Sequence, residues 1–281
     1  MQPVLLACLS AFLFGGMTVA VRVALQRGAH AETGAFHTVL VAFCVVLPFA
    51  LAAGGDVRGA WPFLLAGILG PGGSQVFFTL AVRDAGPARA SVAVGTAPLV
   101  AVAIALVFLG EPLEAALVVG ALLVVAGGAA LATERHRPER FAPIGLVFAL
   151  TATVLFATRD NVVRWLSGGT EVAPALAAGA ALLAGWVCIL GYLLATGRRP
   201  RLRALPPFAP AGVLFGLSYV SLFAAFYGGR VSVVSPLVAT ESLWGVALSA
   251  LVLGRSERIG PRLVAGALLV VAGGALIGSA R

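Results

Sequence analysis

The stretch Gly-Ala-Leu-Leu-Val-Val-Ala-Gly-Gly-Ala occupies residues 120–129, and the same ten residues recur without a change at 266–275. The likeness continues upstream, where Ser91, Thr96, Leu99, Leu109 and Gly110 each recur 144 positions later, as Ser235, Thr240, Leu243, Leu253 and Gly254. A ten-residue identity alone could arise by chance in so simple a composition, but an aligned flank at nearly constant spacing is not expected by chance. The chain therefore consists of two copies of one unit, 1–137 and 138–281.

The composition indicates that the protein is surrounded by lipid rather than by water. Hydrophobic residues make up 60% of the chain, charged residues 11%, and the mean hydropathy is +1.03. Soluble proteins have roughly 25% charged and about 45–50% apolar residues. The chain has too little polar surface to cover itself in water, which predicts a multi-pass protein of the cell membrane.

A helix that spans a bilayer needs about 20 apolar residues. Ten segments qualify: 4–24, 34–53, 61–82, 90–109, 114–132, 143–166, 172–195, 207–227, 232–253 and 262–279. Backbone groups in hydrocarbon must pair within their own segment, so all ten are predicted to be helices. The predicted fold is an all-α integral membrane protein with ten transmembrane helices and no separate soluble domain.

Five spans per copy is an odd number, so the second copy must enter the membrane from the opposite side. This predicts a 5+5 inverted-topology repeat, a frequent plan of secondary transporters. Thirteen arginines fall in loops on the side away from the termini, namely Arg27, Arg83, Arg89, Arg135, Arg137, Arg140, Arg198, Arg199, Arg201, Arg203, Arg255, Arg258 and Arg262. Four fall on the side of the termini, namely Arg58, Arg164, Arg230 and Arg281. Taken alone, this count predicts that both termini lie outside the cytoplasm.

The net charge of +8 does not indicate nucleic acid as a partner. All 19 basic residues are Arg, and nearly all lie between apolar segments, which is typical of anchoring at a membrane surface. Cys8, Cys44 and Cys188 lie inside apolar runs and predict neither a disulfide nor a zinc site. The motifs of metalloproteases, serine hydrolases and phosphate-binding loops are absent from the sequence, so we expect no cofactor, no metal and no enzymatic activity.

Several motifs of the first half match a known family. They are Ala81 near the end of the third span, Ala90 and Ser91, the mid-span Pro98, and Leu109-Gly110-Glu111 at the end of the fourth span. With these motifs and ten spans in two halves, the chain resembles the EamA-type branch of the drug/metabolite transporter superfamily over essentially its whole length. The second half departs from the pattern, with Ser242 at the copy of Pro98, Arg255 at the copy of Glu111, and Glu257 two residues further on.

The resemblance implies a secondary transporter that exports small metabolites such as amino acids or drug-like compounds by alternating access. It also implies a central cavity walled by both halves and cytoplasmic termini, in conflict with the arginine count. The expected partners are a small-molecule substrate, the lipid bilayer and protons, and the expected state is a monomer or a weak homo-oligomer. The alternative is a non-transporting membrane receptor or membrane-embedded enzyme with the same bundle, which would need an appended domain or a catalytic constellation.

Ionisable residues inside the spans are the strongest candidates for a substrate-binding site, because a charge at mid-membrane costs at least about 2.5–3.5 kcal/mol. Arg159, Asp160 and Asn161 interrupt the sixth span. Successive residues of a helix differ in direction by about 100°, so we expect Arg159 and Asp160 to face different neighbours. The alternative is that they lie near the membrane edge and pair with each other.

Glu241 lies near the middle of the ninth span, in the polar run Thr240-Glu241-Ser242, with Trp244 following. A carboxyl group in hydrocarbon favours its neutral form, which makes Glu241 a candidate proton carrier, whereas a nearby Arg159 would keep it ionised. We hypothesise that Glu241 and Arg159 form a charge pair or flank a zwitterionic substrate. The first-half copy of Glu241 is Ala97, so this position is polar in one half only.

The remaining candidates for the substrate site rest on repeat position. Ser74 and Gln75 in the third span match Ser218 and Tyr219 in the eighth, and Thr96 is the copy of Thr240. The alternative for these residues is hydrogen bonding between helices, worth roughly 0.6 kcal/mol on average. His37, near the start of the second span, is predicted to be structural.

Overall fold

The structure is a computed structural model that describes residues 2–108, 115–134, 141–254 and 259–279. Within these residues it consists of helices and connecting turns, without strands. The first-half helices are α1 (Gln2–Gln26), α2 (Ala31–Ala53), η1 (Arg58–Ala60), α3 (Pro62–Gly67), the π-helical η2 (Ile68–Ser74), α4 (Gln75–Ala85), α5 (Pro87–Val94), α6 (Ala97–Phe108) and α7 (Ala115–Ala132). The second-half helices are α8 (Ile144–Ser167), α9 (Pro174–Ala195), η3 (Leu202–Ala204), η4 (Pro206–Phe208), α10 (Ala209–Gly228), α11 (Val231–Val238), α12 (Glu241–Leu253) and α13 (Pro261–Ser279).

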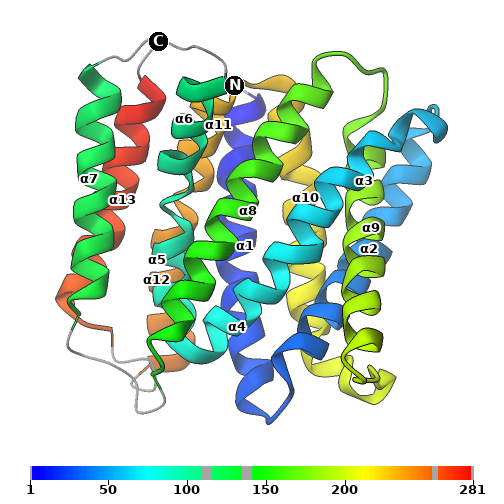
Figure 1. Cartoon of the computed structure of the whole chain (residues 1–281), viewed down its shortest axis with the longest axis horizontal. Coiled ribbons are helices and arrows are strands. Elements are labelled where there is room, and N and C mark those ends of the chain that lie inside the picture. The colour runs from blue at the N-terminus through cyan, green and yellow to red at the C-terminus, as the bar shows by residue number, and fades with distance from the viewer. Residues whose placement is uncertain (1, 109–114, 135–140, 255–258, 280–281) are drawn as a thin grey trace.

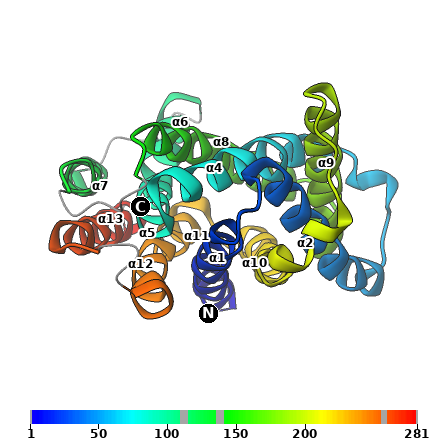
Figure 2. The ribbon, with the colours of Figure 1, turned by 90° about the horizontal axis from the view of Figure 1, so that it is seen from below.

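The helices stand side by side as one bundle, and α1 starts at the end of the bundle where α13 finishes (Figure 1). Seen from below, α7 and α13 lie at one end of the long axis and α2 and α9 at the other (Figure 2). Seven helical segments are long and apolar enough to cross a membrane, and two shorter apolar helices, Val118–Leu131 and Pro261–Ile277, accompany them. The sequence prediction of an all-helical membrane protein is confirmed at this level.

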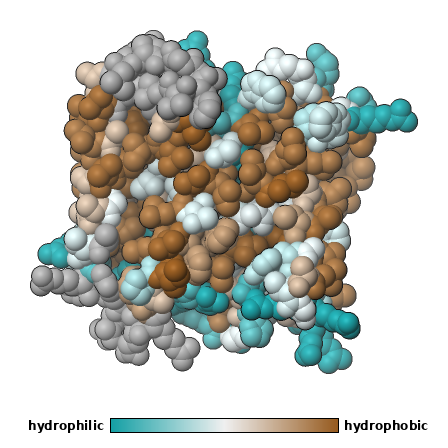
Figure 3. Space-filling model, in the orientation of Figure 1, coloured by the Kyte–Doolittle hydropathy of each residue, from teal (hydrophilic) through white to brown (hydrophobic). Residues whose placement is uncertain are grey.

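The outer surface of the bundle is apolar. Leu251 is 80% exposed and Leu51 is 73% exposed. Figure 3 shows, on the face in view, a hydrophobic band across the middle of the molecule, with hydrophilic residues gathered at its two ends. A contiguous apolar surface of this extent marks contact with a membrane or a partner.

Three of the predicted spans are interrupted. In the third, η2 separates α3 from α4, and Gly70 within it has a ψ of −106°, outside helical values. Pro71 follows, and its ring disfavours helical backbone at the preceding residue. The fourth span breaks between α5 and α6 at Gly95–Thr96, and the ninth breaks between α11 and α12 at Ala239–Thr240.

The breaks in the fourth and ninth spans have the same local structure. Thr96 Oγ1 donates to the carbonyl of Ala93 at 2.6 Å, and Thr240 Oγ1 donates to that of Leu237 at 2.6 Å. A hydroxyl in this position competes with the backbone for the carbonyl oxygen and favours a break in the helix. Pro98 adds to the first break, because it lacks the N–H that would continue the helical ladder.

The two identical ten-residue stretches, carried by α7 and α13, pack directly on each other. A Cβ atom on Gly120 would lie 2.7 Å from the carbonyl oxygen of Gly273, and one on Gly127 would lie 2.7 Å from that of Gly266. The pairing of early residues of α7 with late residues of α13 makes the two helices antiparallel. Only glycine allows the backbones to approach so closely.

Arginines cap two further helix ends. Arg22 of α1 donates from Nη1 to the carbonyl of Arg83 at 2.9 Å and to that of Val82 at 3.3 Å, at the end of α4. Arg164 of α8 donates from Nη1 to the carbonyl of Phe226 at 3.0 Å, near the end of α10. Carbonyl groups in the last turn of a helix lack helical partners, and cationic side chains satisfy them well.

Candidate functional site

A small cavity lies in the middle of the bundle, where the breaks of the fourth and ninth spans meet α1, α8 and α10. It is lined by Ser10, Phe14, Val94, Ala97, Phe156, Arg159, Asp160, Leu222, Ser235, Val238, Ala239 and Glu241. Its volume of about 30 Å³ is enough for water, which needs roughly 10–15 Å³. Sites that hold small molecules measure about 300–1,000 Å³, so the cavity is too small for such a ligand in this conformation.

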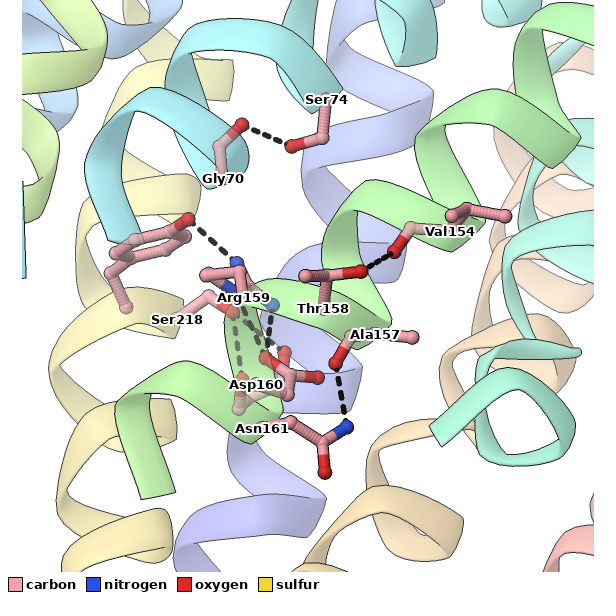
Figure 4. A network of polar contacts seen from close by, with 11 residues as sticks. Gly70, Ser74, Val154, Ala157, Thr158, Arg159, Asp160, Asn161 and Ser218 are labelled. Carbon is pink, nitrogen blue, oxygen red and sulfur yellow. Dashed lines mark hydrogen bonds and ion pairs between the residues drawn. The ribbon is translucent and has the colours of Figure 1, made fainter. Parts of the chain in front are cut away.

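A buried ion pair forms one wall of this cavity. Asp160 Oδ1 accepts hydrogen bonds from Arg159, at 2.8 Å from Nε and 2.6 Å from Nη2. Arg159 and Asp160 are each 4% exposed. Tyr219 of α10 accepts a third bond, 2.6 Å from Arg159 Nη1 to its Oη. Figure 4 shows Arg159 and Asp160 turned toward each other from neighbouring positions of α8.

This geometry decides between the two alternatives for Arg159 and Asp160. The two side chains pair with each other, and Arg159 also reaches Tyr219. The Cα–Cβ bonds do diverge, but the arginine side chain is long enough to turn back to the adjacent carboxylate. Both residues are buried, which contradicts the part of that alternative in which they lie at the membrane edge and extend toward water.

The rest of the Arg159 side chain is enclosed by aromatic rings and backbone. Its guanidinium carbon lies 5.0 Å from the ring centroid of Phe156 and 5.2 Å from that of Tyr219. Its Cδ packs against Gly70, where a Cβ would approach within 2.7 Å. The distorted backbone of η2 thus makes room for the arginine, and local distortions of this kind are frequent at functional sites.

Glu241 begins α12 and is 3% exposed. Its Oε1 has no hydrogen-bond partner. Among the described residues it forms no ion pair, because Arg159 is engaged by Asp160. The expected direct pair between Glu241 and Arg159 is therefore not present in this conformation, and the two groups instead lie on the wall of the same cavity.

The other polar residues predicted on the ninth span have different surroundings. Thr240 forms the break described above, and Ser242 is buried and donates to the carbonyl of Ala239 at 2.9 Å. Trp244 lies away from the cavity, 42% exposed on the outer surface, with its ring edge-on to Phe12 at 5.0 Å.

The candidates on other spans are fixed by hydrogen bonds. Asn161 donates from Nδ2 to the carbonyl of Ala157 at 2.9 Å, and Thr96 holds the break of the fourth span. Ser218 shares hydrogen bonds with Ser10 across the interface of α1 and α10, at 2.9 Å between the hydroxyl oxygens. Asn161, Thr96 and Ser218 are not among the residues that line the cavity.

Two more of the polar residues singled out in the sequence, Gln75 and His37, lack full hydrogen bonding. Gln75 is buried with its Nε2 3.8 Å from Met17 Sδ, and its Oε1 is unpartnered. His37, predicted to be a hydrogen-bonded structural residue, is fully buried; neither ring nitrogen meets the geometry of a hydrogen bond, but backbone groups of Thr33 and Arg201 interact with the imidazole. It packs between aromatic rings, Phe36 at 5.4 Å and Phe208 at 6.3 Å.

Nine of the twelve residues that line the cavity were not predicted from the sequence, among them Ser10, Ser235, Phe14 and Phe156. Ser235 is the copy of Ser91 and lies beside the break of the ninth span, so its repeat position was a usable signal. The phenylalanines give no such signal, because aromatic residues are equally expected in lipid contacts and helix packing.

An apolar helical bundle with an ion pair and a carboxyl group buried at its centre defines a multi-pass membrane protein. The model of the EamA-like transporter family matches residues 1–133 and 143–279, and the chain belongs to that family. It is thus a transporter of the drug/metabolite type, in a family of transporters rather than enzymes. The motif residues Leu109–Glu111, Arg255 and Glu257 lie outside the described residues.

Comparison with other proteins adds support for the fold. No curated protein sequence matches the chain. Among solved structures 19 chains match. One of these, a crystal structure titled only as that of a protein, is similar with a TM-score of 0.70 and 23% identity, over 98% of this chain and 95% of its own. At that identity the likeness concerns the fold alone.

Proposed function

We propose that this protein is a secondary active transporter of the cell membrane that exports small metabolites, such as amino acids or drug-like compounds, by alternating access. The observation that carries the proposal is Glu241, a buried carboxyl group whose Oε1 has no hydrogen-bond partner, on the wall of a small cavity at the centre of the bundle. Buried ionisable groups of this kind persist in membrane proteins chiefly where they serve transport or proton transfer.

The charges around the cavity favour proton coupling through Glu241. The ion pair of Arg159 and Asp160 is internally neutral, so an ionised Glu241 would be the unbalanced charge of the site. An unpaired buried carboxylate is costly, so the group holds a proton or binds a cation. We propose that Glu241 exchanges a proton for the positively charged part of a substrate.

We further propose that ten spans form a 5+5 inverted repeat of residues 1–137 and 138–281. Three observations support it: the antiparallel glycine contact of α7 and α13, the equivalent breaks at Thr96 and Thr240, and the arginine caps from Arg22 and Arg164. Discontinuous helices at the interface of two repeats are typical of transporter binding sites. Rocking of the two halves around these breaks would enlarge the cavity toward one side at a time.

Transport by reconstituted protein tests the proposed function. Proteoliposomes would be supplied with amino acids, nucleosides and organic cations, with an imposed proton gradient and a pH-sensitive dye inside. Glu241→Gln should abolish substrate-driven proton movement, because the amide cannot release a proton. Glu171→Gln, an exposed carboxylate between α8 and α9, is the matched control and should transport like the wild type. An unchanged rate and pH profile in Glu241→Gln would exclude the carboxyl group from coupling.

Labelling tests the inverted repeat. Arg58 and Arg201 occupy equivalent loops of the two copies and are both exposed. In a variant without Cys8, Cys44 and Cys188, single cysteines at these two positions should react with an impermeant reagent from opposite sides of the membrane. Labelling of both from one side would contradict the inversion, whatever the substrate proves to be.

A further inference from the structure

A second pocket lies far from the central cavity, at the end of the bundle where α1 finishes. It has a volume of about 410 Å³ and lies between the start of α2 and the connection from α9 to α10. Its lining residues are His30, Thr33, Arg198, Arg199, Arg201 and Ala204. Four of these six side chains are basic or imidazole groups, and none is acidic.

The pocket is built from fixed turns. α9 ends at Ala195, and Gly197 follows two residues later with a φ of 72°. The N–H of Arg198 donates to the carbonyl of Leu193 at 2.8 Å, and that of Gly197 donates to the carbonyl of Leu194 at 3.1 Å. This paired arrangement is a Schellman motif, which fixes the direction of the chain after the helix. Across the pocket, Glu32 in the first turn of α2 forms an ion pair with Arg198 and joins the two walls.

The pocket keeps an excess of positive charge after that ion pair is counted. Arg199 and Arg201 form no ion pair or side-chain hydrogen bond among the described residues. The start of α2 adds partial positive charge, since His30 at its N-cap makes no capping bond with its side chain. Guanidinium groups present several N–H donors in a plane and match the paired oxygens of a phosphate or a carboxylate group.

The surroundings indicate where that phosphate would come from. Leu202, which directly follows Arg201, is 72% exposed, and Leu194 on the last turn of α9 is 58% exposed. Apolar side chains next to arginines at the end of a membrane helix suit the boundary between headgroups and acyl chains. Basic pockets between helices at this depth favour anionic headgroups.

We propose that this pocket binds a phosphate group with net negative charge, and that the apolar rim favours a phospholipid headgroup over free phosphate as its source. A bound headgroup would bridge α2 to the connection between α9 and α10, and so would stabilise this end of the bundle.

The test compares lipid compositions and two sets of variants. Purified protein would be placed in phosphatidylcholine vesicles with and without phosphatidylglycerol, and its thermal unfolding and the lipid retained in native mass spectrometry would be measured. The Arg199→Gln/Arg201→Gln double variant should weaken phosphatidylglycerol binding by about 30-fold. Arg203→Gln, in the same connection but outside the pocket lining, should bind like the wild type. Equal unfolding temperatures in pure phosphatidylcholine would establish that the double variant is folded.

A second arm separates the two sources of phosphate. Inorganic phosphate would be added to lipid-free protein in detergent, with sodium chloride at matched ionic strength as the control. Protection by phosphatidylglycerol in the wild type and in Arg203→Gln, lost in the double variant, supports the proposal. Protection by inorganic phosphate alone overturns the lipid assignment. Equal phosphatidylglycerol binding by the double variant and the wild type overturns the site itself.

Discussion

The hydroxyl of Tyr219 should contribute more to stability than an ordinary hydrogen bond between membrane helices. Neutral bonds of that kind are worth about 0.6 kcal/mol on average. The bond from Arg159 to Tyr219 is 2.6 Å long, its donor is charged, and both residues are buried. Bonds to charged groups are worth roughly 1.5–3 kcal/mol, so Tyr219→Phe should lose about that amount while its ring remains beside the guanidinium group.

Tyr227 provides a control on the same helix. Its hydroxyl is buried without a hydrogen-bond partner, so Tyr227→Phe should leave stability unchanged or raise it slightly. At roughly 2–4 °C per kcal/mol, Tyr219→Phe should lower the apparent unfolding temperature by about 3–12 °C. The assay is heating in detergent at one fixed rate, followed by size-exclusion chromatography of the surviving protein. Equal shifts in the two variants, or a loss for Tyr219→Phe of only about 0.6 kcal/mol, would refute the reasoning.

Two further variants test other contacts by the same heating assay. Gly127→Ala places a Cβ 2.7 Å from the carbonyl oxygen of Gly266 and should force α7 away from α13. Gly128→Ala meets nothing within 4 Å and should gain about 0.5–1 kcal/mol of helix propensity. Equal stability of the two variants would contradict the close glycine contact, or seam, between α7 and α13. Asp160→Asn leaves the cation of Arg159 buried without its counter-charge, which should cost about 3–5 kcal/mol and lower the yield of folded protein. In contrast, Arg159→Met combined with Asp160→Asn should recover much of that loss, and failure to recover would show that the pair does more than neutralise itself.

The helical segments could be predicted from the sequence because a segment in lipid must be apolar and must pair its backbone groups internally. The predicted span 143–166 differs from α8, Ile144–Ser167, by one residue at each end. The breaks inside the fourth and ninth spans were not predicted, since hydropathy does not register a threonine hydroxyl that takes a backbone carbonyl. Pro98 gave a partial warning in the fourth span, but in the ninth Pro236 lies inside α11, ahead of the break.

The sequence predicted which charged residues belong to the candidate site, but it predicted less well how their side chains are arranged. Arg159, Asp160 and Glu241 do share one cavity. The pairing of Arg159 with Asp160 was one of two alternatives, and the sequence did not decide between them because the directions of the Cβ atoms do not limit how far an arginine side chain reaches. Trp244 was chosen for its closeness to Glu241 along the chain, and closeness along a helix does not determine which face a side chain occupies.

The seam between α7 and α13 has a consequence for how the chain tolerates change. Gly120 and Gly127 each meet a backbone oxygen of α13, and the glycines that supply those oxygens meet the backbone of α7 in turn. The close approach of each ten-residue stretch therefore depends on glycines in the other. A larger residue at one of these glycines would require its partner helix to move away, because the partner position is also a glycine and has no side chain that could be made smaller.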